Sequence, residues 1–206
     1  MIIEVRTYGL KPGSLAEVEK RFGEALPGRQ KLSKLAAFWH TEVGPLNEIT
    51  HIWTYDSFEQ RIAIRAEAIK IGVWPPKTSE FIVSMQTEIF LAAPFSPALE
   101  PREVGPLFEI RSYTYAPGAL PPVIERWAGA IGERVKLSPL VGAWYSEIGG
   151  LNKWVHIWAY KDATERQRVR AEAVERGIWP PPSAGPGLLL KQENKLVMPA
   201  SFSPLR

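Results

Sequence analysis

The chain contains the same sequence pattern twice, and this duplication restricts its possible folds more than any other feature. When the 206-residue sequence is shifted by about 105 residues, residues 3–76 align with residues 108–181 without a gap, and about 30 of the roughly 74 aligned positions are identical. The segment Glu4–Tyr8, for example, returns as Glu109–Tyr113. A period this long indicates a duplicated domain and not a solenoid of short repeats.

The two copies are separated by a short segment with the composition of a linker. Residues 98–106 are rich in proline and glutamate, which favours an exposed connection. The tails of the copies also correspond, since Phe-Ser-Pro stands at 95–97 and again at 202–204. We therefore predict a first domain over residues 1–97 and a second domain over residues 107–206.

Each copy predicts two helices and four strands. Residues 3–8 alternate apolar and polar side chains, which is typical of a strand, whereas apolar residues recur at helical spacing after Ser14 and after Ser57. Both serines are placed as N-terminal caps, each with a Glu or Gln three residues later. The elements predicted for the first copy are a strand over 3–8, a helix over 14–26, strands over 36–43 and 49–55, a helix over 57–72 and a strand over 81–91.

The order β-α-β-β-α-β is that of a ferredoxin-like domain, with both helices on one face of a four-stranded antiparallel sheet. The other face needs a cover because it carries large aromatic side chains, and the twin copy can supply one. We therefore predict an α+β fold of two tandem ferredoxin-like domains whose antiparallel sheets pack face to face, as a dimer within one chain. A further association of whole chains into a homo-oligomer stays open.

Residues that are identical in both copies mark the candidate ligand-binding positions. Along the first strand every second position is identical, and the same holds for the strand that carries His51. We predict that this polar and aromatic face points away from the helices, into the space between the two sheets, where it lines a small-molecule site. The residues concerned are Arg6, Tyr8, Trp53 and Tyr55 with their counterparts Arg111, Tyr113, Trp158 and Tyr160.

Structural interpretations of the same residues stay open beside this functional one. The Glu-x-Arg-x-Tyr strand is either an anchor for a substrate carboxylate or an internal ion pair that holds the assembly together. The repeated tryptophans are either core and interface anchors or plates on which a ligand stacks. The arginines of the second helix, such as Arg61 and Arg166, pair most simply with acids across an interface.

His51 and His156 are the candidate proton-transfer residues, because imidazole titrates near neutral pH. Glu42 and Glu147 are identical across the copies, and the hairpin that follows each glutamate can bring it beside the histidine as an orienting partner. The alternative is a histidine that only hydrogen-bonds to a neighbour. No metal site is predicted, since the histidines lack the close spacing of metal ligands.

The composition argues against several classes of function. The net charge of +3 comes from Lys and Arg interspersed with Glu, so we expect no binding to nucleic acid. No apolar run approaches the roughly 20 residues that cross a membrane, so we expect no membrane partner. The chain has no cysteine, which excludes disulfides and thiol chemistry and agrees with a cytoplasmic protein.

The motifs assembled so far, in this order, resemble those of the NIPSNAP family. The matching elements occur over Glu4–Gly13, Trp39–Asn47 and His51–Arg65, and again over Glu109–Gly118, Trp144–Asn152 and His156–Arg170. The resemblance implies a dimeric α/β barrel, in which the tandem copy takes the place of a second subunit. It also implies a site between the sheet and the helices of each unit, in contrast to the face chosen above.

Three functions compete at this stage. The first is an enzyme or binding protein for a small, partly hydrophobic molecule without a bound cofactor, since the wider superfamily includes cofactor-independent monooxygenases, isomerases and cyclases. The second is a structural or protein-interaction module, in which the repeated residues only maintain the interface between the copies. The third, also implied by the superfamily, is haem binding through one of the histidines.

Overall fold

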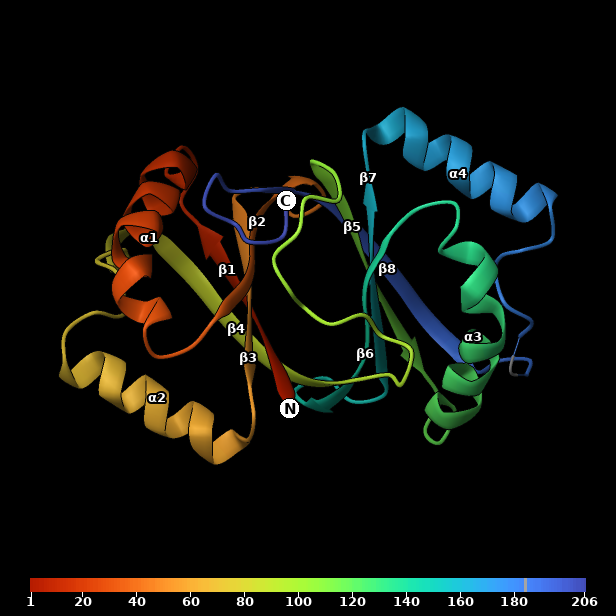
Figure 1. Ribbon diagram of the computed structural model, residues 1–206, viewed down its shortest axis with the longest axis horizontal. Coiled ribbons are helices and arrows are strands. Elements are labelled where there is room, and N and C mark those ends of the chain that lie inside the picture. The colour runs from red at the N-terminus through yellow and green to blue at the C-terminus, as the bar shows by residue number, and fades with distance from the viewer. Residues whose placement is uncertain (184) are drawn as a thin grey trace.

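The computed structural model describes residues 1–183 and 185–206. Its elements follow the β-α-β-β-α-β order twice, which confirms the α+β fold (Figure 1). The first half contains β1 (Ile2–Leu10), α1 (Leu15–Gln30), β2 (Leu35–Val43), β3 (Glu48–Tyr55), α2 (Phe58–Lys70), a short 3-10 helix (Ser79–Phe81) and β4 (Ile82–Ala92). The second half contains β5 (Leu107–Tyr115), α3 (Leu120–Arg134), β6 (Leu140–Ile148), β7 (Lys153–Tyr160), α4 (Ala163–Glu175) and β8 (Leu189–Pro199).

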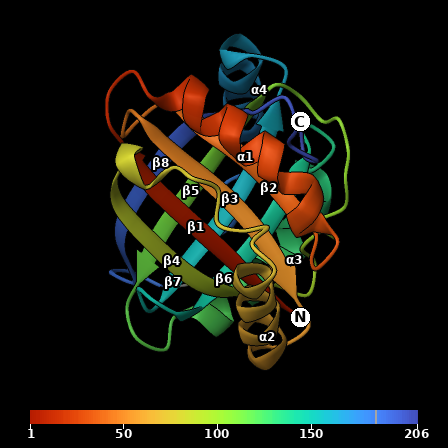
Figure 2. The ribbon, with the colours of Figure 1, turned by 90° about the vertical axis from the view of Figure 1, so that its left-hand side faces the viewer.

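The eight strands form one closed barrel in the order β1-β3-β2-β8-β5-β7-β6-β4, and every neighbouring pair is antiparallel. Each half contributes four adjacent strands, and two seams join the halves, β2 with β8 and β4 with β6. The helices lie outside the barrel, α1 and α2 on one side and α3 and α4 on the other (Figure 1). Figure 2 shows α1 and α2 in front of the strands of the first half. The twin copy therefore supplies the strands that close the barrel.

The barrel interior is lined mainly by positions that differ between the copies, so the predicted assignment of the strand faces is wrong. On β1, Ile3 and Val5 belong to an apolar cluster inside the barrel that includes Phe108 of the second half. The alternate residues Arg6 and Tyr8 lie on the other face, where Tyr8 packs with residues of α1. The physical reason is that buried charges need partners, and the helices provide these partners whereas the apolar barrel interior does not.

Among the described residues, an ion pair lies across each seam. In both pairs the second half supplies the lysine and the first half supplies the glutamate. Lys195 donates to Glu48 at one seam, and Lys153 donates to Glu88 at the other. The repeat places Lys153 at the position of Glu48, and the matching registers of β4 and β8 place Lys195 at the position of Glu88. The two halves are therefore complementary in charge to each other, whereas two copies of one half would bring like charges together.

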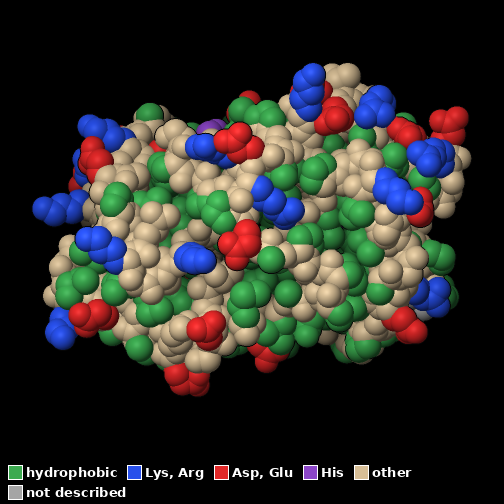
Figure 3. Space-filling view, in the orientation of Figure 1, with side chains coloured by type: hydrophobic (Ala, Val, Ile, Leu, Met, Phe, Trp, Pro, Cys, Tyr) green, Lys and Arg blue, Asp and Glu red, His purple; other side chains and the backbone are tan. Residues whose placement is uncertain are grey.

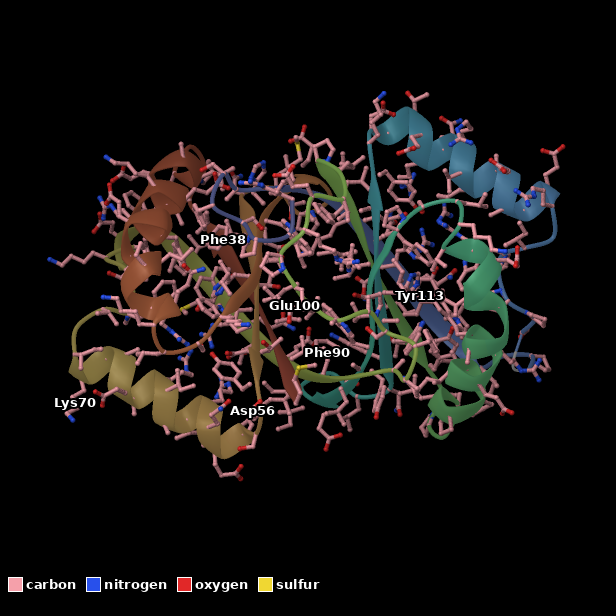
Figure 4. All side chains as sticks on the ribbon, in the orientation of Figure 1. Phe38, Asp56, Lys70, Phe90, Glu100 and Tyr113 are labelled. Carbon is pink, nitrogen blue, oxygen red and sulfur yellow. The ribbon has the colours of Figure 1, made fainter. Side chains whose placement is uncertain are left out.

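The chain segments that follow β4 and β8 are exchanged between the halves. Phe95 packs in the hydrophobic cluster of the second half, and Phe202 packs in that of the first half. The exchange is fixed by hydrogen bonds such as that from the Phe38 N–H to the Ser203 hydroxyl at 3.0 Å. The linker with Glu100 then runs across the front of the barrel in Figures 1 and 4. Neither half is complete without the tail of the other.

The predicted cap at Ser57 is correct, and the predicted cap at Ser14 is wrong. The Ser57 hydroxyl accepts a hydrogen bond from the Gln60 N–H, and its counterpart Asp162 accepts one from the third residue of α4. Ser14 instead donates to the carbonyl of Lys11 and closes the preceding turn. A serine before a helix can cap the helix or close the preceding turn, and the sequence pattern does not distinguish the two. The local backbone geometry decides between them.

The surface carries mixed charges. On the face shown in Figure 3, basic and acidic side chains are interspersed over both halves. Over residues 1–183 and 185–206, no helix is long and apolar enough to cross a membrane.

Candidate functional site

A buried ion network occupies the space between the sheet and the helices of the first half. The carboxylate of Glu4, fully buried, accepts hydrogen bonds from Arg6 at 2.8 Å and from Arg61 at 2.5 Å. The Thr87 hydroxyl donates to it at 2.9 Å, and Arg6 also donates to the Tyr8 hydroxyl at 2.6 Å. Burial alone would raise the pKa of Glu4, but the hydrogen bonds and charges of the two arginines lower it to about 2. The carboxylate is therefore ionised at neutral pH.

The second half repeats this network, with its outer arginine more exposed. Glu109, also fully buried, accepts hydrogen bonds from Arg111 at 2.7 Å and from Arg166 at 2.6 Å. Asn194 donates to the same carboxylate at 3.2 Å. The Arg166 side chain is 23% exposed, against 12% for Arg61 in the first half. In both halves the Glu-x-Arg-x-Tyr strand forms an internal ion pair, which was the structural alternative.

The two candidate histidines lie in these networks, each beside a tryptophan. The indole N–H of Trp53 donates to Nδ1 of His51 at 2.7 Å, and that of Trp158 donates to Nδ1 of His156 at 2.8 Å. Because an indole nitrogen only donates, Nδ1 is the unprotonated nitrogen and each imidazole is neutral. Burial and nearby arginines lower the pKa of His51 to about 3 and hold the pKa of His156 well below its ordinary value.

The predicted Glu–His dyad is wrong in both halves. The register of β2 and β3 places Phe38, four residues before Glu42, opposite His51. Glu42 and Glu147 are exposed near the ends of their strands, whereas His51 and His156 are 1% exposed. A carboxylate near the end of a strand keeps its contact with water, which avoids the cost of burying a charge beside a neutral imidazole.

Haem ligation through these histidines also lacks structural support. In both imidazoles Nδ1 already accepts a hydrogen bond, and Nε2 of His51 and of His156 is completely enclosed by protein. An axial ligand to haem iron needs an exposed ring nitrogen. His156 lies in the wall of a cavity described below, but its Nε2 is buried.

Each half buries a further arginine that bonds to hydroxyl groups instead of a carboxylate. Arg134, near the end of α3, donates to the Ser138 hydroxyl at 2.9 Å and to the Tyr160 hydroxyl at 3.2 Å. Its guanidinium lies 4.0 Å from the centre of the Trp158 ring. Burial lowers the pKa of Arg134. Arg29 makes the equivalent contacts in the first half.

Two adjoining cavities lie between the sheet and the helices of the second half. An inner cavity of about 250 Å³ lies against Arg111, Arg134 and Arg170, and an outer cavity of about 300 Å³ lies against Arg126 on α3. The residues common to both are Tyr113 (Figure 4), Trp179, Pro180 and Gln192. The other aromatic and proline residues of the walls are Tyr115, Trp127, His156, Trp158, Pro181 and Pro182. Among the described residues, no acidic side chain lines either cavity.

Positive charge is in excess around these cavities. Glu109 bonds to Arg111 and lies 3.8 Å from Arg170, so one carboxylate serves several arginines. Arg134 bonds only to hydroxyl groups. Within the part of the chain that the structure describes, Arg126 has no acidic partner. Such a surplus in a partly enclosed space favours an anionic ligand.

The first half has a clasp where the second half has its outer cavity. Arg21 on α1, the counterpart of Arg126, pairs with Glu17 at 2.7 Å and with Glu80 at 2.9 Å. Its guanidinium also lies 4.9 Å from the centre of the Phe81 ring. This Arg21 clasp ties α1 to the segment that precedes β4. The charge of Arg21 is therefore paired, whereas Arg126 has no acidic partner among the described residues.

The structure brings the predicted ligand-binding residues together, but on the face that the helices cover. Arg111, Tyr113 and Trp158 line the cavities of the second half, and Tyr160 lies behind them, bonded to Arg134. Their counterparts Arg6, Tyr8, Trp53 and Tyr55 are buried in the first half. Sequence reasoning missed Arg29, Arg126 and Arg134, which come from helices. A signal was present for two of them, since Arg29 and Arg134 continue the apolar stripe of their helices at helical spacing.

The fold and the repeated network define a tandem α/β barrel built from two ferredoxin-like units. The NIPSNAP family model matches residues 3–97 and 108–204, so the chain belongs to the NIPSNAP family and carries its domain twice. The chain is 29% identical over 211 residues to the human protein named Protein NipSnap homolog 3B, covering 98% of this chain and 85% of that protein.

Two solved structures are similar to the chain, one over about half of it and one over nearly its whole length. A NIPSNAP-like domain protein from Burkholderia xenovorans is 32% identical and covers 48% of this chain and 91% of its own, with a TM-score of 0.44. A candidate monooxygenase from Fusobacterium nucleatum covers 97% of this chain and 92% of its own with a TM-score of 0.67, at 8% identity. The second likeness concerns the fold alone.

Proposed function

We propose that the second half binds a small, partly hydrophobic anion in its two adjoining cavities. The observation that carries the proposal is that four arginines and no described acidic residue line these cavities. Aromatic and proline walls suit a flat apolar body, and Arg126 and Arg170 are the cations best placed to hold a carboxylate, because buried bonds do not engage them fully.

The geometry supports binding more directly than proton-transfer catalysis. His156 is neutral, and its Nδ1 is engaged by Trp158. Burial raises the pKa of Tyr160, so this hydroxyl stays protonated at neutral pH. Isomerase-, cyclase- or monooxygenase-like turnover would therefore depend on the reactivity of the ligand itself, with the arginines stabilising negative charge that develops on it.

The test is a calorimetric titration of the full chain with 2-naphthoate and with 2-naphthamide, which has the same shape and no charge. We expect naphthoate to bind and the amide to bind at least about tenfold more weakly, since charge-assisted hydrogen bonds contribute about 1.5–3 kcal/mol. Arg170→Met should weaken naphthoate binding by a similar factor. Equal affinities for the acid and the amide would contradict the proposal.

Arg65, at the position of Arg170 in the first half, provides the matched control. The first half also has a hollow beside α1, of about 710 Å³, but its Arg21 is paired with two acids and Glu24 lines the hollow too, which supports a structural role in which this half completes the barrel without binding the anion. Under this assignment Arg65→Met leaves naphthoate binding unchanged. An equal loss of affinity in both variants would mean that the effect of Arg170→Met reports general destabilisation.

The setting in which the protein works is also a proposal. We take the functional unit to be a monomer, because the second half of the chain closes the barrel. Light scattering after gel filtration, which gives the mass in solution, tests this. A cytoplasmic location is supported by the lack of cysteine, and imaging of the tagged full chain tests it.

A further inference from the structure

We infer that the barrel interior is a second binding site, separate from the arginine-lined cavities, and that it takes a small uncharged molecule. A cavity of about 260 Å³ lies inside the barrel and contacts seven of the eight strands. An eight-stranded barrel is wide enough either to be filled by side chains or to hold one small ligand, and here the filling is incomplete.

The lining of this interior cavity defines the class of ligand. Its apolar part consists of Val5, Ile52, Phe90, Ile110, Trp144, Val155 and Ile157. Hydroxyl groups of Thr7, Thr50 and Ser112 follow along the strands toward the end of the barrel away from the linker. This gradient suits a molecule with an apolar body and one hydroxyl or carbonyl group.

The charged residues that line the cavity are already paired, so they do not call for a charged ligand. Lys195 is paired with Glu48, and Lys153 with Glu88, at the two seams. Glu193 pairs with Lys191, at 2.9 Å. The local charges therefore cancel, in contrast to the surplus of arginines on the other side of the same sheet.

One glycine creates much of the room. A Cβ atom on Gly142 would lie 2.4 Å from a ring atom of Trp144, so the indole can lie flat against the strand only because residue 142 has no side chain. In the first half Ala37 stands at the same position, and Trp39 points its indole N–H to the carbonyl of Leu205 at 3.1 Å. The indole N–H of Trp144 has no partner among the described residues.

This difference makes Gly142→Ala a precise way to close the cavity. The new methyl group would force the Trp144 ring off the strand, and the adjacent open space is the cavity that this ring lines. The fold should tolerate the change, because alanine occupies the equivalent position 37 in the first half. Ala37→Gly is the matched control. It alters the same position of the other half, where Trp39 is held by the Leu205 carbonyl and does not line the cavity.

The experiment is a titration of the full chain with 2-naphthol, followed by calorimetry and by ¹H–¹⁵N NMR of the tryptophan indoles. We expect saturable binding that shifts the indole signal of Trp144, which Trp144→Phe identifies. Gly142→Ala should weaken naphthol binding at least about tenfold and Ala37→Gly should leave it unchanged. Ser112→Leu, which fills the cavity from another wall, gives the same test independently of the folding of Gly142→Ala.

The outcomes separate this site from the arginine-lined cavities. Excess 2-naphthoate should not displace 2-naphthol, and Arg170→Met should leave naphthol binding intact. Displacement by naphthoate, an unchanged naphthol affinity in the cavity-filling variants, or the lack of saturable naphthol binding to the wild-type chain would each overturn the inference. None of these results depends on whether the second half binds an anion.

Discussion

The two halves of the chain share one buried network and differ in the space above it. In the first half the Arg21 clasp joins α1 to the segment before β4. In the second half Pro122 replaces Glu17 and Gly187 replaces Glu80, so Arg126 has neither of the acids that Arg21 uses. The outer cavity beside Arg126 therefore has an arginine without an acidic partner among the described residues, whereas the hollow beside Arg21 has an arginine that is already paired.

This comparison teaches that residues identical in the two copies build the shared network, and that a few differences around them decide whether an arginine such as Arg126 is paired. Each half must neutralise its buried glutamate, so Glu4 and Glu109 keep the same arginine partners. A binding site is under no such requirement to appear twice within one chain. Two substitutions, at the positions of Glu17 and Glu80, are enough to leave Arg126 without the acidic partners of Arg21.

The largest effect is expected at the seams, where the halves differ by opposite charge. Lys153→Glu combined with Lys195→Glu places two carboxylates together at each seam, and we expect a loss of about 3–6 kcal/mol in the free energy of unfolding, measured in urea. Adding Glu48→Lys and Glu88→Lys restores opposite charges and should recover most of the loss. A fourfold variant no more stable than the double variant would refute the complementarity of the halves.

The second prediction concerns the buried histidines, which should behave alike in both halves. The unfolded chain protonates His51 and His156 below about pH 6.5, whereas the folded chain keeps both neutral, with the pKa of His51 at about 3. Stability therefore falls as the pH falls, by about 1.2 kcal/mol for each histidine between pH 6 and 5.

The measurement for this prediction is the free energy of unfolding at pH 6 and at pH 5, where the buried glutamates do not yet contribute. His51→Asn and His156→Asn keep an acceptor for the neighbouring indole and remove the titration, so each should remove about half of the pH dependence. A much larger effect of one variant would show that the two networks are not energetically equivalent.

The sequence predicted the fold well because the repeat and the alternation of residues determine it together. It picked out several residues that line the arginine-lined cavities, such as Arg111 and Tyr113, and placed them on the wrong face of the sheet. Alternation along β1 separates Ile3 and Val5 from Arg6 and Tyr8, but it does not say which set faces the helices. That choice depends on partners such as Arg61 and Arg166, which come from other elements. The Glu42–His51 dyad failed for a similar reason, since strand register follows from the whole hairpin.

The smallest expected effect comes from grafting part of the clasp onto the second half. Pro122→Glu places a carboxylate four residues before Arg126, in the geometry by which Glu17 holds Arg21, and an acid suits the first turn of α3. The pair is exposed, so we expect the affinity for 2-naphthoate to fall only about threefold, or roughly 0.7 kcal/mol. Glu17→Gln, which weakens the clasp in the first half, should leave this affinity unchanged. An unaltered affinity in Pro122→Glu would assign ligand anchoring to Arg170 alone, and the difference between the halves would then lie in the inner cavity.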